Sequence, residues 1–443
     1  MKPSPAGATP QHHPTTSRAH GPTLAFDDAW AALCARHLPD LDALAVDTGV
    51  ITRVQAIASG AQLLRLLLAY VTADLSLRTT SAWAYDALGL RIGDEGLRDK
   101  FRLCAPFLAA ALAHVLGVRR AAAAATGPCV RLVDATTLSQ PGSAGIDARV
   151  HATYDLGAQA LAGVDVTEPS GGEGLAHAAA ARFDVPVGDR AYGLAVHLHE
   201  AAARGLCPLV RAQLPNVRLT DAAGRVVAPA VWLEAAEGGA HDHDVWVPYE
   251  RRPLLAARLV FTPLPAEAAA RARQALRKRS AKKGRTPPAL ALRVAGYLVL
   301  LTTLPRAHAP VEALRQLYPL RWQVELWFKR SKSLLGLGRL KRFGPAMRRV
   351  FVLGKLLAAA LLEAARPPHA TVRRAGAPPP SLWRVTHLLA VTFAAVVYGT
   401  GAVVSPAATR RLTERPRHHR RYAHDALAAV RAWLRQLPGE APA

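Results

Sequence analysis

The sequence predicts an α/β protein in which helical regions flank a sheet of mixed strand direction, and three observations support this. Beyond Pro128, short apolar runs rich in β-branched residues, such as CVRLVDATTL at 129–138, alternate with helical stretches. Before that point, apolar residues recur at helical spacing from 26 to 118, and no proline occurs between Pro39 and Pro106. Helical spacing returns from 311 to 335.

The composition indicates a folded protein with a polyanionic partner. The chain has 443 residues, of which 51% are hydrophobic, so it can bury a sizeable core. Its net charge of +24 favours nucleic acid or an anionic membrane surface as the partner. Four cysteines (Cys34, Cys104, Cys129 and Cys207) lack metal-ligand spacing. We therefore expect neither a zinc module nor disulfides, and a reducing cytoplasm as the compartment.

The N-terminal third divides into a tail and a helical domain. Residues 1–22 are polar and proline-rich without an apolar signal segment, so we expect a disordered tail. Residues 23–127 are predicted to form an all-helical domain, in which AQLLRLLLAYV at 61–71 has apolar residues at i, i+3, i+4 and i+7. Such a domain is either a reader of DNA ends or a scaffold, and both interpretations stay open.

Residues 128–214 are predicted to form the first part of the sheet. Three strands are expected at 129–138, 148–156 and 160–168, followed by a helical stretch around 174–181. Next come a strand that ends in a polar turn (VPVGDRAYG, 185–193), a helix at 193–204 and a strand at 207–214. This order of strands and helices favours a sheet with both parallel and antiparallel pairs.

The region 215–305 is predicted to be rich in β-structure. Strands are expected in VVAPAVWLE (226–234), HDVWVPYE (243–250), LAARLVFTPL (255–264) and AGYLVLLTTL (295–304). A basic helix at 271–285, with eight Lys and Arg in fifteen residues, interrupts them.

The last third is predicted to be helical. Residues 306–366 contain one helix at 311–335 and another near 347–365, a proline-rich linker follows at 367–381, and 382–443 form a basic helical region. The uncharged stretch 388–404 has 17 residues, the short limit for a membrane span. Because it is rich in alanine and contains Gly399 and Gly401, we interpret it as a buried core helix and expect no membrane partner.

Two aspartates are candidates for phosphoryl-transfer chemistry. Asp134 is predicted at the end of an apolar strand and Asp189 at the end of another. Cleavage of a phosphodiester is served by two metal ions roughly 4 Å apart, and Mg²⁺ prefers carboxylate ligands from separate elements. The competing interpretation of either residue alone is a turn former or helix cap.

A third carboxylate lies on the helix at 311–335. At about 100° per residue, Tyr318, Arg321, Glu325 and Lys332 fall within a roughly 60° arc of one face. Cations on that stripe can neutralise phosphates while the carboxylate holds a metal. The competing interpretation is a solvated face with i,i+4 ion pairs. Pro319 favours a helix start here, which puts Tyr318 just outside the helix.

The spacing Tyr318-x2-Arg321-x3-Glu325-x6-Lys332 resembles the Tyr-Arg-Glu-Lys signature of DDE transposases of the insertion-sequence-four type. The resemblance extends over about 130–365 and includes VDATTL, GIDARVHATYDL, GDRAYG, CPLVRAQL, YLVLLTTLP and RWQVELWFKRSKSLLGL. It implies a ribonuclease-H-like catalytic core (128–214 and 306–366) interrupted by a β-rich insertion at 215–305.

The resemblance also implies roles for individual residues. Asp134, Asp189 and Glu325 would be the catalytic residues and would bind two Mg²⁺ ions, for which Mn²⁺ can substitute. DNA phosphates would be held by Tyr318, Arg321, Lys332 and Arg211. Arg190 and Tyr192 would either position DNA or brace Asp189. The candidate for stacking on a flipped base is Tyr297, with Trp246 and Trp232 behind it, and core packing is the competing interpretation of all three.

The activity implied is cut-and-paste transposition in the bacterial cytoplasm. The partners would be double-stranded DNA, as transposon ends and as target, and a second copy of the chain. The alternatives are a transposase-derived DNA-binding protein that no longer cuts, and a nuclease without strand transfer.

Other charged clusters are assigned separately. The basic runs 271–285 and 339–349 favour phosphate tracking over a solvated face. His241-Asp-His243-Asp is interpreted as a polar loop rather than a metal site, because no further ligands are matched to it. Asp155 and Asp165, on neighbouring predicted strands, are assigned to structure.

Overall fold

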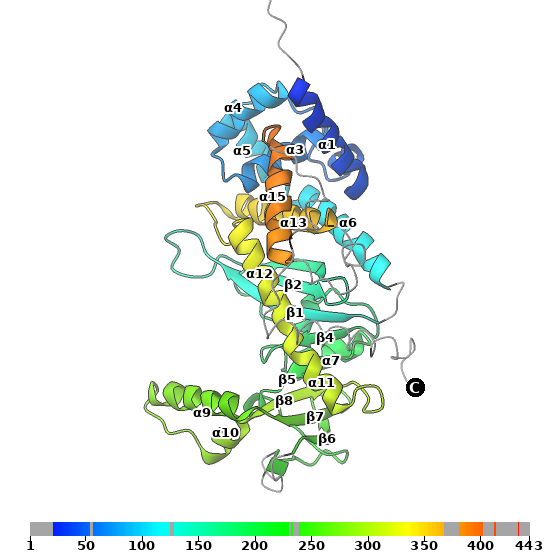
Figure 1. The fold of residues 1–443 in the computed structure, drawn as a ribbon, viewed down its shortest axis with the longest axis vertical. Coiled ribbons are helices and arrows are strands. Elements are labelled where there is room, and N and C mark those ends of the chain that lie inside the picture. The colour runs from blue at the N-terminus through cyan, green and yellow to red at the C-terminus, as the bar shows by residue number, and fades with distance from the viewer. Residues whose placement is uncertain are drawn as a thin grey trace, which may run out of the picture.

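The computed structural model describes residues 21–53, 56–124, 128–229, 232–233, 239–366 and 381–401, together with Leu412 and Trp433. Most of the predicted tail, most of the proline-rich linker and most of the region after 401 therefore lie outside the described residues. Within them, the protein is a mixed α/β structure with one eight-stranded sheet and many helices, as predicted (Figure 1).

Six helices precede the sheet, which confirms the helical prediction for this region. They are α1 (Gly21–His37), α2 (Leu41–Asp47), α3 (Gly60–Thr72), α4 (Leu77–Leu88), α5 (Asp94–Arg102) and α6 (Ala105–Ala124). Their ends follow local chemistry. Side chains of Asp40, Ser59 and Ser76 accept hydrogen bonds from the first backbone N–H groups of α2, α3 and α4. Gly89 ends α4 at φ 67°, where a glycine avoids strain.

The sheet has the strand order β3-β2-β1-β4-β5-β8-β7-β6. The strands are β1 (Val130–Leu138), β2 (Ala148–Asp155), β3 (Ala160–Thr167), β4 (Val185–Gly188), β5 (Leu209–Arg211), β6 (His241–Val247), β7 (Leu255–Pro263) and β8 (Tyr297–Thr302). Strands β1, β4 and β5 are parallel, whereas β1–β2–β3 and β5–β8–β7–β6 are antiparallel. Helix α7 (Ala195–Ala203) connects β4 to β5. The strands of the region 215–305 thus extend the same sheet.

The helix expected around 174–181 is wrong, since only a 3-10 turn, η1 (Leu175–His177), forms there. Neighbouring side chains bind the backbone groups that a helix would need. Arg204 donates to the carbonyls of Leu175 and Ala178 at 3.0 and 2.8 Å. Thr153 and Asp184 accept from the backbone N–H groups of residues 179 and 181. Tertiary hydrogen bonds have replaced the local ones.

The strand expected at 226–234 is also wrong in its described part. Val226 forms only an isolated bridge to Thr220, and residues 227–229 are not in a strand. Pro229 lacks the N–H that a ladder needs, which is sufficient reason for the run to stop. The 3-10 turn η2 (Leu214–Asn216) precedes this region.

Helices after β8 cover one face of the sheet. α11 (Val311–Leu317), the 3-10 turn η3 (Tyr318–Arg321) and α12 (Trp322–Leu334) run across the strands (Figure 1). α13 (Pro345–Ala364) follows, as predicted, and its residues from Val350 to Leu362 are all buried.

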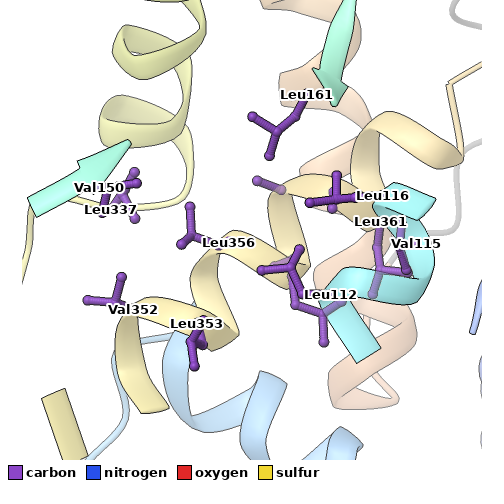
Figure 2. Packing of buried hydrophobic residues seen from close by; sticks show 14 of the residues in the cluster. Leu112, Val115, Leu116, Val150, Leu161, Leu337, Val352, Leu353, Leu356 and Leu361 are labelled. Atoms are coloured by element: carbon purple, nitrogen blue, oxygen red, sulfur yellow. The ribbon is translucent and has the colours of Figure 1, made fainter. Parts of the chain in front are cut away.

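The main hydrophobic core lies around α13. In Figure 2, Leu353, Leu356 and Leu361 of α13 lie beside Leu112, Val115 and Leu116 of α6, with Val150 and Leu161 from the sheet in the same cluster. The N-terminal helices and this face of the sheet therefore share one continuous core. A second cluster, around Val133, Val210 and Leu301, fills the opposite face.

The uncharged stretch near the C-terminus forms α15 (Leu382–Tyr398), and residues 402–404 lie outside the described part. It buries Val385, Leu389 and Phe393, which confirms a core helix. In the described part no single helix is long and apolar enough to cross a membrane; α5 and α6, which meet at a 59° bend, pass that test only as a pair. None of the four cysteines forms a disulfide.

Candidate active site

Three polar residues stand level on neighbouring parallel strands. Paired residues on β1 and β4 differ by 55 in number, and those on β4 and β5 by 22. Extending both registers by a residue or two puts Asp134 level with Asp189, and Asp189 level with Arg211. Adjacent strands lie about 4.8 Å apart, so the three residues form a row across the sheet. Asp189 follows β4 directly, as predicted, but the prediction for Asp134 is wrong, because it is the fifth of nine residues in β1.

The row faces the helices of the main core. Leu132, Val187 and Leu209 belong to the main core, whereas Val133 and Val210 belong to the core on the opposite face. Side chains two positions apart in a strand share a face. Asp134, Asp189 and Arg211 each lie two positions after a main-core residue, so they point toward the side covered by α12.

Helix α12 brings its own polar residues over this row. Lys332 Nζ donates to Thr136 Oγ1 of β1 at 2.6 Å, which fixes how the helix lies on the strand. Arg321 donates to Glu325 Oε1 at the start of α12. The sequence predicted one helical stripe, but η3 breaks the helix at Tyr318–Arg321, as Pro319 suggested. Tyr318 caps α11 and is 9% exposed.

The carboxylates of Asp134, Asp189 and Glu325 interact electrostatically. Burial raises the pKa of Asp134 from its usual 3.8 to about 7, and the charges of Glu325 and Asp189 add to the increase. Arg321 and the backbone N–H of Ala135 oppose this increase in the pKa. All three predicted catalytic residues therefore lie within electrostatic range of one site.

The three carboxylates are chemically suited to bind a divalent cation. Three carboxylates from two strands and a helix are hard oxygen ligands of the type Mg²⁺ prefers. A cation among them would offset the burial and the carboxylate repulsion that together raise the pKa of Asp134. As the side chains stand, the described residues contain no group of three ligating side chains able to hold a metal ion. Glu325 is instead ion-paired with Arg321, so ligation would require its side chain to turn toward the strands.

Cationic and phenolic groups surround the carboxylates. Burial raises the pKa of Tyr318, and the charges of Arg321 and Arg211 lower it. Burial lowers the pKa of Arg190, and the nearby Arg211 lowers it further. The predicted phosphate ligands Tyr318, Arg321, Lys332 and Arg211 thus lie around Asp134 and Asp189, together with Arg190, which was predicted to position DNA or brace Asp189.

Comparison with known proteins accounts for this arrangement. The family model described as the transposase DDE domain matches residues 125–361, which is more than half of the chain. The chain belongs to the DDE transposase family. The resemblance seen in the sequence is thereby confirmed.

Relatives of the transposase come from bacterial insertion sequences. The transposase for insertion sequence element IS421 of Escherichia coli is 31% identical over 353 residues, which cover 76% of this chain and 93% of that protein. The InsL protein of element IS186A from Escherichia coli strain K12 is 31% identical over 352 residues, with the same coverage. The protein is therefore a DNA-cleaving transposase of the insertion-sequence type.

A solved structure of a piggyBac transposase synaptic complex with hairpin DNA aligns with 96% of this transposase and 87% of its own chain, at 9% identity and a TM-score of 0.41. The family assignment depends on the sequence relatives.

Tyr192 lies beneath the site of the transposase. It is 2% exposed and belongs to the opposite core. A Cβ at Gly188 would lie 2.8 Å from Tyr192, so the motif GDRAYG packs this ring directly behind β4. The burial of Tyr192 favours bracing of Asp189 over direct contact with DNA.

The aromatic residues proposed for base stacking are engaged in packing. Tyr297 meets Phe261 edge to face, with ring centroids 6.3 Å apart. Trp232 stacks on His243 at 4.1 Å. Trp246 pairs through its backbone with Thr220. Packing is favoured for the rings of Tyr297 and Trp232, and base stacking by Tyr297 stays a prediction.

The rival acidic residues have structural partners. Arg131 donates to Asp155 at 2.5 Å and to Asp184 at 2.9 Å, with all three side chains buried. Asp165 binds His177 at 2.7 Å. These pairs agree with the assignment of Asp155 and Asp165 to structure.

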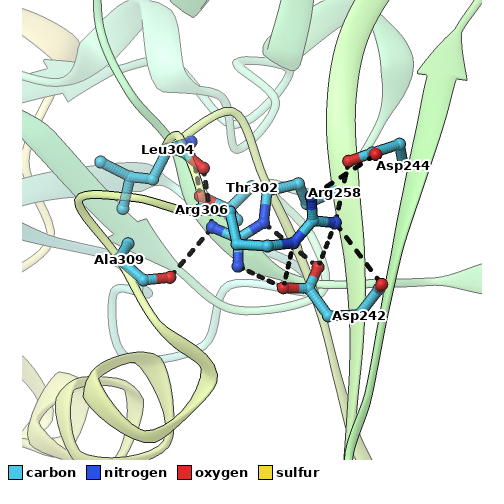
Figure 3. A network of polar contacts seen from close by, with 7 residues as sticks. All are labelled: Asp242, Asp244, Arg258, Thr302, Leu304, Arg306 and Ala309. Atoms are coloured by element: carbon cyan, nitrogen blue, oxygen red, sulfur yellow. Dashed lines mark hydrogen bonds and ion pairs between the residues drawn. The ribbon is translucent and has the colours of Figure 1, made fainter.

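The run His241-Asp-His243-Asp lies in β6, so the polar-loop interpretation is wrong. Figure 3 shows Asp242 bound by Arg258 and Arg306, with Asp244 also bound by Arg306. Arg258 donates as well to the carbonyls of Leu304 and Ala309. The acidic residues of this run thus tie β6 and β7 to the connection that leads into α11.

Three residues near the site were missed in the sequence. Thr136 was only part of a strand pattern, although it binds Lys332. Trp322, next to Arg321, is 56% exposed. Glu173 pairs with Arg149 at 2.8 Å. Burial is the main cause of the raised pKa of Glu173, and the nearby charge of Asp189 raises that pKa further. Of the three, only Trp322 could have been noticed from sequence, because it lies within the signature between Arg321 and Glu325.

Proposed function

We propose that this transposase cuts DNA at the ends of an insertion sequence and joins the freed 3′ ends to target DNA. Asp134, Asp189 and Glu325 are its catalytic residues, holding two Mg²⁺ ions for which Mn²⁺ can substitute. The observation that carries this proposal is the level register of Asp134 and Asp189 beneath the helix that bears Glu325. The family match, which spans all three residues, supports it.

The core that presents them is best interpreted as ribonuclease-H-like. Its support is the strand order β3-β2-β1-β4-β5, with an antiparallel first part and α7 between the parallel β4 and β5. The strands β6–β8 and the helices between β7 and β8 are then the insertion between the second and third catalytic residues.

The residues of the site have separate roles in the proposed reaction. Bound divalent ions would activate the attacking oxygen and stabilise the leaving one. Asp134 must give up its proton before it can bind a cation, and its raised pKa makes this step dependent on pH. Arg321, Lys332 and Arg211 neutralise phosphate charge, and Tyr318 and Arg190 hold the backbone beside the cleaved bond. Tyr192 braces the turn after β4 from below.

The substrate of the proposed reaction is double-stranded DNA in the bacterial cytoplasm. An insertion sequence has two ends, so two copies of the chain acting together are the simplest assembly that cuts both.

The proposal is tested by cleavage of DNA that carries the element's ends. Glu325→Gln removes a metal ligand and should lower the rate more than about a hundredfold, because such ligation supplies several kcal/mol. The matched control is Glu312→Gln on α11, where the carboxylate pairs with Arg315 at 2.6 Å on the surface. It should cleave and join DNA like the wild type. Equal rates for Glu325→Gln and the wild type would rule out the catalytic assignment.

A further inference from the structure

The charge of the transposase is unevenly distributed along the chain. Residues 23–127 contain ten Lys and Arg and ten Asp and Glu, so the N-terminal helical region has no net charge. Residues 215–366 contain 27 Lys and Arg against 10 Asp and Glu, a net +17. A DNA-binding surface is recognised by positive charge, and of these two regions the second has the excess.

Several cations of the N-terminal helices are paired with neighbouring carboxylates. Arg78 pairs with Asp94 at 3.6 Å, Arg98 with Glu95 at 3.3 Å, and Arg102 with Asp99 at 4.0 Å. Because the paired charges largely cancel, these helices attract a polyanion only weakly beyond the Debye length.

One segment of the second region projects from the sheet as an arm, which we define as residues 264–296. It comprises α9 (Ala266–Ala281), α10 (Ala289–Val294) and their connections (Figure 1). Pro263 pairs with Tyr297, so the arm leaves β7 and returns to β8 at one edge of the sheet. β8 runs antiparallel to β5, which is parallel to β4. That edge is therefore the one at which β4 ends in Asp189.

The arm holds cations that are exposed and have no acidic partner among the described residues. They are Arg277, Lys278, Arg279, Lys282, Lys283, Arg285 and Arg293. Arg277, Lys278 and Arg279 are consecutive at the end of α9, and Lys282, Lys283 and Arg285 follow that helix directly, so like charges are crowded there. Only two other cations hold the arm together: Arg271 pairs with Glu267, and Arg273 donates to the carbonyl of Leu292. A polyanion would offset this crowding.

The arm lies at the same end of the sheet as the active site. It leaves β7 after Pro263 and rejoins β8 at Tyr297, at the end where Asp189 follows β4 and Arg211 ends β5. Cations that project from this end are placed to bind phosphates that flank the cleaved bond.

We propose that the arm is the surface on which this transposase grips duplex DNA next to the cleaved bond, through contacts to successive phosphates. The N-terminal helices act as a scaffold for the catalytic core. This inference depends on the proposed function only in that the ligand is DNA. Because backbone contacts dominate, the grip is independent of base sequence.

The test is DNA binding without divalent metal, in EDTA, so that its outcome is separate from catalysis. A fluorescent duplex with an element end, and an unrelated duplex of equal length, are titrated by anisotropy over a series of salt concentrations. The arm variant replaces Arg277, Lys278 and Lys282 with Gln. The control replaces Arg78, Arg98 and Arg102 of the N-terminal helices with Gln.

Each phosphate contact contributes about 0.9 to the slope of log K against log salt. The arm variant should lower that slope by about two to three on both duplexes, and the control should leave it unchanged. Since all six side chains are exposed, both variants should melt like the wild type. An unchanged slope in the arm variant, or an equal loss in the control, would overturn the proposal.

Discussion

At the scale of single residues, the decisive group is Asp134. Its carboxyl is largely buried within electrostatic range of Asp189 and Glu325, and this environment favours either a proton or a cation. Its pKa of about 7, against 3.8 for an ordinary aspartate, makes that preference measurable.

The stability of the metal-free transposase should therefore depend on pH. Between about pH 4 and pH 7 the folded state keeps a proton on Asp134 that the unfolded state has lost, so stability falls as pH rises through this window. The loss is on the order of a few kcal/mol. Asp134→Asn removes it, so this variant should be the more stable protein at pH 8.

Denaturant unfolding in EDTA at pH 5 and pH 8 measures the difference. A wild type as stable at pH 8 as at pH 5, with Asp134→Asn no better, would show that the carboxyl is not buried as described.

Tyr192 offers a second test at this scale, between bracing and DNA contact. Because the ring is buried, Tyr192→Ala should lower the free energy of unfolding by about 3–5 kcal/mol. Tyr192→Phe keeps the packed ring and should fold and bind DNA nearly like the wild type. Loss of DNA binding in the Phe variant, with stability intact, would favour the contact instead.

At the scale of elements, sequence patterns located most helices and strands but not every position that matters for the site. The strand at 129–138 was predicted nearly as observed, but Asp134 was placed at a strand end, whereas β1 continues to Leu138 because β2 pairs with it to that point. One sequence does not show which strands pair, so the position of Asp134 within the ladder was not predictable. The alanine-rich stretch at 178–181 has high helix propensity, but Arg204, Thr153 and Asp184 bind its backbone first. Local propensity failed where distant side chains competed.

Helix α13 is the element on which the fold depends most. Leu356 is fully buried in the core that the N-terminal helices share with the sheet (Figure 2). Leu356→Ala should lower the free energy of unfolding by about 2–5 kcal/mol. The circular dichroism signal of the helices and the activity of the site should disappear in the same unfolding transition, because the N-terminal helices and the sheet share this core.

Val391→Ala, at an exposed position on α15, is the control and should change stability by less than about 0.5 kcal/mol. Two separate transitions in Leu356→Ala would contradict a shared core.

At the scale of the whole molecule, the site is assembled from three distant parts of the chain. The signature Tyr318, Arg321, Glu325 and Lys332 allowed Glu325 to be singled out as a candidate, because its spacing can be recognised in one continuous stretch of sequence. The level register of Asp134, Asp189 and Arg211 was not predictable, because it is a property of pairing between strands. Nor could the sequence show that the strands of 215–305 extend the same sheet and direct a basic arm to the edge where Asp189 lies.

The central claim is that Asp134, Asp189 and Glu325 together hold the divalent ions of the reaction. The most direct measurement is anomalous X-ray diffraction from crystals of the transposase with DNA and Mn²⁺. Two manganese peaks about 4 Å apart, ligated by these three carboxylates, are predicted. Manganese bound only elsewhere, with Glu325 still paired to Arg321, would contradict the claim.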